Sequence, residues 1–130
     1  MKQNLALVTA SLLSIVLMTV HLADDIVRGF EKAGVAIFVA VPVLVIWSYG
    51  TLVLAERRSG CVIILLGSLL ATLAPVIHFR ATGAVASGEM ARTSGALFFV
   101  WTLIALGVTA LFSVVLSARE LWRLSRGRAR

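Results

Sequence analysis

The sequence is poor in charged residues, which make up 14% of its 130 positions, where roughly a quarter is usual in a soluble domain. Hydrophobic residues account for 60%, and a soluble domain of this composition would lack the polar residues to cover its surface. The only cysteine, Cys61, excludes an internal disulfide framework and a metal site built from cysteines alone. A soluble enzyme, a disordered chain and a nucleic-acid-binding module are therefore disfavoured.

Motifs of catalytic machinery are also missing from the chain. The sequence contains no His-Glu-x-x-His, no glycine-rich phosphate loop and no Gly-x-Ser-x-Gly. Serine and threonine are plentiful but fall mostly in apolar stretches, where their hydroxyls bond to their own helix backbone. No nucleophile stands beside a base, so we expect a protein that is not an enzyme.

Long apolar runs are what the chain has in abundance. Each is about as long as the 20 residues that a helix needs to cross a bilayer, and none shows the alternation of a transmembrane barrel strand. Helices satisfy their own backbone hydrogen bonds in lipid. We therefore predict an all-α polytopic membrane protein, with a compact four-helix transmembrane bundle over residues 1–117 and a basic tail over 118–130. The predicted spans are residues 4–23, 34–55, 61–79 and 95–117.

The first apolar run also fits a secretory signal peptide, because Lys2 precedes it. Cleavage after Ala23 would place His21 at the third position before the cut, where a small residue is required. The run is also long for a signal. We expect it to remain as a membrane span.

Lysine and arginine are distributed unequally between the two sides of the predicted bundle. Because positive residues concentrate in the cytoplasm, and an even number of spans brings both ends of the chain together, both termini are predicted to be cytoplasmic. Arginine outnumbers lysine ten to two, which together with much Ala, Val and Gly favours a bacterial inner membrane. The predicted cytoplasmic side carries Lys2, Arg57, Arg58, Arg119, Arg123, Arg126, Arg128 and Arg130, and the other side carries Arg28, Lys32, Arg80 and Arg92.

The basic tail interleaves apolar residues with its arginines. This pattern is typical of a short helix that lies on anionic lipid headgroups, which we expect Arg119, Arg123, Arg126 and Trp122 to contact. Topology and lipid binding together account for the net charge of +6. No nucleic-acid partner is expected.

The two halves of the chain resemble each other weakly. A shift of 57 residues places Ser11-Leu12-Leu13 on Ser68-Leu69-Leu70 and His21 on His78. Chance matches are common among apolar helices, but histidine is rare in them, so a duplicated two-helix hairpin is one interpretation. Small residues then recur at helical spacing before each histidine and predict that the first and third spans pack together. The predicted contact residues are Ala10, Ser14, Gly67 and Ala71.

Polar residues gather at the outer ends of the first and third spans. His21 is followed by Asp24 and Asp25, at least one of which shares its face if the helix continues. Imidazole and carboxylate are ligands of transition metals, whereas His21 and His78 could instead hold a haem from two sides or form a pH-sensitive pair with a carboxylate. Histidines that simply mark the membrane boundary are the fourth interpretation.

Two functions follow as expectations. The first is an accessory or assembly subunit that packs on a larger membrane complex or on copies of itself and carries no cofactor. The alternative is a metal- or haem-binding membrane protein, with redox activity as one option, that uses the histidine pair near the extracytoplasmic face. Proton-coupled transport would call for an acidic residue within a span, and the predicted spans contain none.

Overall fold

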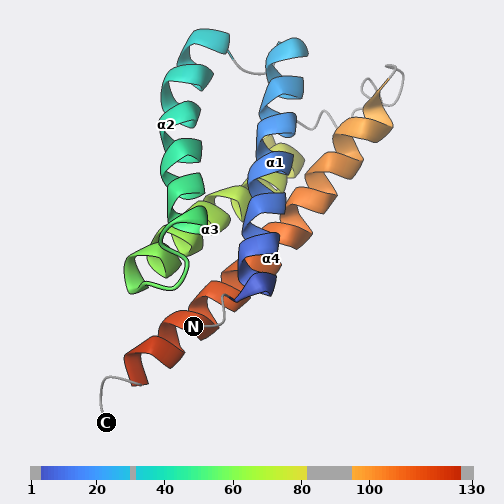
Figure 1. The fold of residues 1–130 in the computed structure, drawn as a ribbon. Helices are drawn as coiled ribbons and strands as arrows, with labels where there is room; N and C mark the ends of the chain where they lie inside the picture. The colour runs from blue at the N-terminus through green and yellow to red at the C-terminus, as the bar shows by residue number, and fades with distance from the viewer. Residues whose placement is uncertain (1–3, 30–31, 82–94, 127–130) are drawn as a thin grey trace.

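The computed structural model describes residues 4–29, 32–81 and 95–126, and these form four α-helices (Figure 1). Each helix is long and apolar enough to cross a membrane. The all-α class and the four apolar helices are thus confirmed for the described part of the chain. The helices are α1 (Leu5–Val27), α2 (Ala33–Leu52), α3 (Arg58–Ala81) and α4 (Ala96–Arg126).

Helices α1 and α4 extend past the C-terminal ends of their predicted spans by a helical turn or more. The side chain of Asn4 accepts a hydrogen bond from the backbone of Leu7 at the start of α1, and α1 continues past Ala23 to Val27. Helix α4 continues without interruption through the predicted tail to Arg126. The remaining tail arginines, Arg128 and Arg130, and the N-terminal Lys2 lie outside the described residues.

Polar contacts fix the directions of the helices. At one end of the bundle, Asn4 Nδ2 donates to Glu120 Oε2 at 3.4 Å and Arg58 donates to the carbonyl of Leu124 at 2.8 Å. At the other end, Arg28 donates to the carbonyl of Gly95 at 3.0 Å. Helices α1 and α4 are therefore antiparallel, and both chain termini lie at the same end (Figure 1). We call this the termini end and the opposite one the histidine end.

Helix α4 is the packing centre, because it contacts both α1 and α3 extensively. Its fully buried apolar side chains are Phe99, Leu103, Leu106 and Ala110. Helix α2 packs against α1 and α3 and makes no contact with α4 within the described residues. Of the contacting helix pairs, α1 and α3 share the smallest interface.

The predicted seam between α1 and α3 is wrong in one respect. A Cβ atom on Gly67 would lie 2.5 Å from the indole of Trp47, so this glycine admits α2 rather than α1. The adjacent Ser68 donates to Ser113 of α4 at 2.9 Å. Small residues on α3 thus serve its packing against α2 and α4, and α1 meets α3 through His21, Asp25 and His78.

Candidate metal centre

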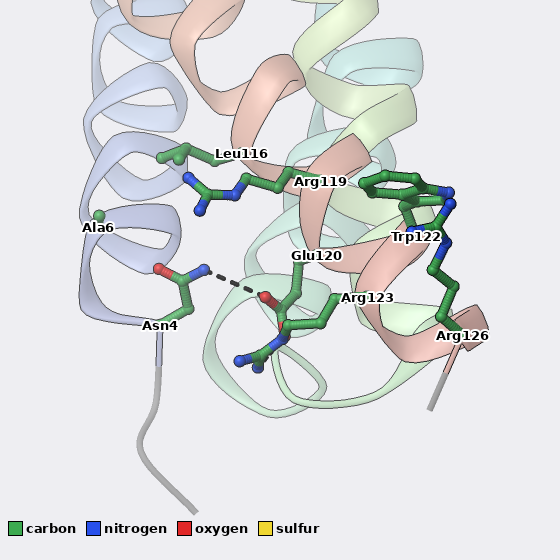
Figure 2. Close-up of a pocket in the computed structure, with 8 residues that line it drawn as sticks. All are labelled: Asn4, Ala6, Leu116, Arg119, Glu120, Trp122, Arg123 and Arg126. Atoms are coloured by element: carbon green, nitrogen blue, oxygen red, sulfur yellow. Dashed lines mark hydrogen bonds and ion pairs between the residues drawn. The ribbon is translucent and has the colours of Figure 1, made fainter. Parts of the chain in front are cut away.

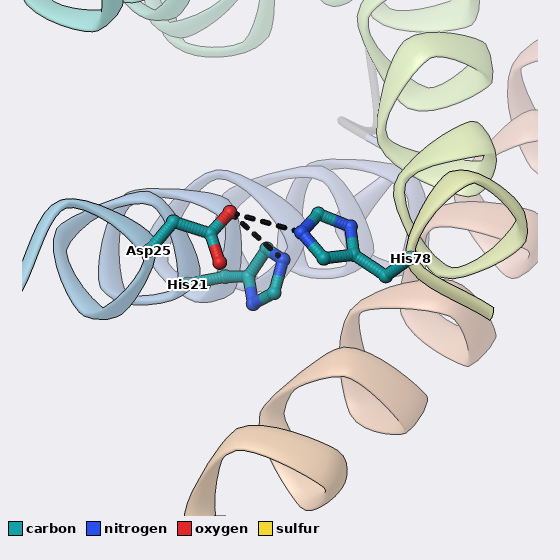
Figure 3. Close-up of side chains that lie close together, drawn as sticks. All are labelled: His21, Asp25 and His78. Atoms are coloured by element: carbon teal, nitrogen blue, oxygen red, sulfur yellow. Dashed lines mark ion pairs between the residues drawn. The ribbon is translucent and has the colours of Figure 1, made fainter. Parts of the chain in front are cut away.

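The histidine end brings together three ionisable side chains from two helices. His21 and Asp25 lie one turn apart on α1, and His78 lies near the end of α3 (Figure 3). Only 2% of His21 and 4% of Asp25 is exposed. Burial of a carboxylate between two imidazoles is costly unless its charge is compensated.

The donor atoms converge on the carboxylate of Asp25. Its Oδ2 lies 3.5 Å from His21 Nε2 and 3.2 Å from His78 Nε2, and a set of ligand atoms from the three residues lies within 4.8 Å of one another. Ligands about 2.0–2.1 Å from a tetrahedral ion are separated by about 3.3 Å. The two imidazole–carboxylate distances therefore match the spacing of a metal's ligands.

The tautomer of His78 follows from a backbone contact. Its Nδ1 lies 2.9 Å from the carbonyl oxygen of Ala74, which can only accept, so Nδ1 carries the proton. In the neutral ring, Nε2 then presents a lone pair to the carboxylate of Asp25. Two acceptors that face each other require a cation between them, either a further proton or a metal ion. The same backbone bond is how metal-ligating histidines are commonly oriented.

An aromatic ring closes the apolar side of the cluster. Phe99 of α4 is fully buried, and its ring centroid lies 5.1 Å from that of His21 and 5.7 Å from that of His78. Arg28 lies over the same ring at 5.4 Å and bonds to Asp24 and to the carbonyl of Gly95. Arg28 thus connects the end of α1 to the start of α4 next to the cluster.

Sequence reasoning named three of the clustered residues and missed two that support them. His21, His78 and Asp25 come together, whereas the carboxylate of Asp24 pairs with Arg28 at 2.8 Å. Asp24 is therefore placed outside the cluster, because an i+4 residue shares the face of His21 better than an i+3 residue does here. Phe99 and Arg28 become recognisable only when α4 is seen to pack against both histidines.

Both Asp25 and Glu120 fall outside the spans predicted from the sequence. Helix α1 continues past Ala23, however, and Asp25 is a buried residue of that helix. Glu120 of α4 is similarly buried at the opposite end.

A haem held by both histidines does not fit this arrangement. The imidazole centroids are 4.8 Å apart and the ring planes meet at 73°. A haem ligated on both faces needs its flat macrocycle between the two rings, and rings in edge contact leave no such slot. The separations of 3.2 and 3.5 Å within the cluster fit either direct pairing of the imidazoles with the carboxylate or the ligands of a small ion.

The predicted lipid-contacting residues lie at the termini end, on the last turns of α4. Arg126 stacks on the indole of Trp122, with its guanidinium carbon 3.8 Å from the ring centroid. Arg123 pairs with Glu120 at 2.6 Å. These groups are separate from the histidine cluster at the opposite end of the bundle.

The described residues thus form four helices that are each long and apolar enough to span a membrane, with a buried group of two histidines and one aspartate at one end. Comparison of the chain with protein-family models, with curated proteins and with solved structures found no match.

Proposed function

We propose that this chain is a metal-binding membrane protein that holds a divalent transition-metal ion through His21, Asp25 and His78. The observation that carries the proposal is the separation of 3.2 Å between His78 Nε2 and the buried carboxylate of Asp25, while the other nitrogen of the same ring lies 2.9 Å from the carbonyl oxygen of Ala74. A metal ion between these atoms converts a repulsion of two acceptors into two coordinate bonds. His21 supplies the third ligand from the same face of α1.

The ligand types narrow the choice of metal. Two imidazoles and one carboxylate are typical of zinc sites that keep a fourth position for water and of non-haem iron(II) sites. Calcium and magnesium prefer a full set of oxygen ligands. Zinc is the appropriate first probe, and cobalt(II) is a coloured substitute of similar coordination.

The proposed setting is the bacterial inner membrane, with the termini end in the cytoplasm and the metal centre near the extracytoplasmic face. The unequal distribution of arginine and lysine supports this orientation. A role as an accessory subunit of a larger complex is compatible with it, and the metal centre would then be what the subunit contributes.

The duplicated hairpin remains part of the proposal. Ser11 bonds to Thr51 and Trp47 in α2, and Ser68, its counterpart in the predicted repeat, bonds to Ser113 in α4. Each serine thus joins its helix to the helix that follows it. This equivalence supports a common origin of the two hairpins.

Metal stoichiometry tests the proposed function. Protein purified in mild detergent is stripped with a chelator, reloaded with zinc, desalted and analysed for metal content. We expect about one zinc ion per chain, and loss of at least tenfold in affinity for His21→Ala, His78→Ala and Asp25→Asn. Asp24→Asn is the matched control, because its carboxylate pairs with Arg28 instead, and it should retain the metal.

A proton is the competing cation in this cluster. If the wild-type protein binds no zinc above the level of Asp25→Asn, or if Asp24→Asn and Asp25→Asn lose zinc equally, the metal proposal is wrong. A cobalt(II) spectrum with ligand-field bands that disappear in His78→Ala would support it independently. Circular dichroism of each variant verifies that the helices are intact.

A further inference from the structure

A pocket separates α1 from α4 at the termini end, remote from the histidine cluster (Figure 2). It encloses about 590 Å³ and has a mixed polar and apolar lining. The lining residues are Asn4, Ala6, Leu116, Arg119, Glu120, Trp122, Arg123 and Arg126. Three arginines against one carboxylate make this the basic end of a helix pair.

The arginines of the pocket are not equivalent. Figure 2 shows the guanidinium groups of Arg119 and Arg123 reaching from α4 toward α1, on either side of the contact between Asn4 and Glu120. Arg126 instead stacks on Trp122, away from α1. The four residues that the sequence analysis assigned together to lipid headgroups therefore form two pairs. Arg119 and Arg123 face the pocket, whereas Arg126 and Trp122 stack on each other.

The negative charge of Glu120 is offset by Arg123, with which it forms an ion pair, and both of its oxygens are engaged. Oε1 accepts from Arg123 at 2.6 Å and Oε2 accepts from Asn4 at 3.4 Å. Glu120 is only 8% exposed, and its carboxylate holds the side chains of Arg123 and Asn4 in position. The guanidinium of Arg119 makes no hydrogen bond or ion pair within the described residues, so its donors remain available in the pocket.

The pocket lies at the depth of lipid headgroups. A hydrocarbon core of about 30 Å corresponds to about 20 residues of helix, which from Ala96 extends to about Leu116. Arg119 and Arg123 follow within two turns, while Leu116 and Ala6 give the pocket an apolar edge toward the membrane. A lipid with its phosphate on the arginines would keep its acyl chains along that edge.

We infer that this pocket binds the phosphate group of one anionic phospholipid, with Arg119 as the principal ligand and Arg123 as the second. Arginine forms paired, charge-assisted hydrogen bonds with phosphate oxygens. This is a discrete site between two helices, which differs from the general attraction of a basic tail to the membrane surface. It does not depend on the proposed metal centre.

Native mass spectrometry with phosphatidylglycerol tests this site. The protein in mild detergent is titrated with phosphatidylglycerol or, separately, with phosphatidylcholine, and the first bound lipid is quantified. We expect Arg119→Gln to weaken the first phosphatidylglycerol by about tenfold, as expected for a charged hydrogen bond. Arg57→Gln is the matched control. Arg57 is exposed in the link between α2 and α3, and its replacement removes the same single positive charge.

Three outcomes would overturn the inference. One is equal affinity of Arg119→Gln and Arg57→Gln for phosphatidylglycerol, which would indicate attraction by overall charge. Another is equal retention of phosphatidylcholine and phosphatidylglycerol by the wild-type protein. The third is displacement of the bound lipid by millimolar inorganic phosphate, which would assign the pocket to free phosphate rather than lipid. Exposure of Arg119 means that the variant should fold normally.

Discussion

Individual hydroxyl groups determine how α1 is fastened to α2. Thr51 donates to the carbonyl of Trp47, so the hydroxyl of Ser11, 2.7 Å away, donates to Thr51. The Ser11 oxygen in turn accepts from the indole N–H of Trp47 at 2.9 Å. The three residues therefore form a closed hydrogen-bonded loop that includes the backbone carbonyl of Trp47, and the Ser11 oxygen satisfies the buried indole N–H.

Replacement of this serine should destabilise the protein. In Ser11→Ala the indole N–H of Trp47 loses its acceptor, and an unsatisfied buried donor costs about 1–3 kcal/mol; inter-helix bonds in membranes are at the lower end, at about 0.6–2 kcal/mol. We expect a lower free energy of unfolding by about 1 kcal/mol, measured by denaturant titration in detergent. Thr19→Ala is the control, because Thr19 is exposed and bonds only to its own helix. Equal stability of the two variants would contradict the role assigned to the loop.

The residues of the candidate site were only partly predictable. Histidine is conspicuous in an apolar helix, so His21 and His78 could be identified from the sequence alone. The sequence alone could not show which of Asp24 and Asp25 joins the histidines. That depends on whether α1 continues past Ala23 and on which carboxylate pairs with Arg28. Phe99 is one apolar residue among many until α4 brings it against both imidazoles.

At the scale of the helices, hydropathy predicted that the four helices exist more accurately than it predicted where each one ends or which helices pack together. Hydropathy identifies the apolar runs, whereas α1 and α4 continue past those runs into charged sequence. A face of small residues predicts close approach but does not say which helix approaches. On α3 that helix is α2, because the indole of Trp47 fills the space at Gly67.

The seam between α2 and α3 should therefore be sensitive to one methyl group. In Gly67→Ala the added Cβ would lie 2.5 Å from the Trp47 ring, and overpacking of a tight contact costs about 1–3 kcal/mol. Gly34→Ala is the matched control, since a Cβ on that helical glycine meets nothing within 4 Å, and alanine favours helix by up to about 1 kcal/mol. Thermal unfolding in detergent should show a decrease for the first variant and none for the second. A similar response of both would contradict the assigned seam.

At the scale of the whole molecule, charge and length predict how the bundle is oriented. The helices alternate in direction and place both termini at one end, which carries most of the arginines among the residues that the structure describes. We expect an alkaline phosphatase fusion at the C-terminus to be inactive and a fluorescent-protein fusion there to be bright. An active phosphatase at the C-terminus would contradict the predicted orientation and would mean that the histidine end lies in the cytoplasm.

A metal ion in the proposed centre should also stabilise the whole bundle, because it would join the pair of contacting helices with the smallest interface. His21 and Asp25 belong to α1 and His78 to α3, so an ion bound by all three connects helices that otherwise share little packing. A ligand that binds only the folded state adds about 2.7 kcal/mol when its concentration is 100 times its dissociation constant. We expect zinc to raise the unfolding temperature of the stripped protein in a concentration-dependent manner and a chelator to reverse the increase.

The unfolding temperature of Asp24→Asn should respond to zinc like that of the wild type, and that of His78→Ala should not respond. An equal zinc effect in His78→Ala would mean that the ion binds elsewhere, whereas no effect in the wild type would show that the buried carboxylate is compensated by a proton.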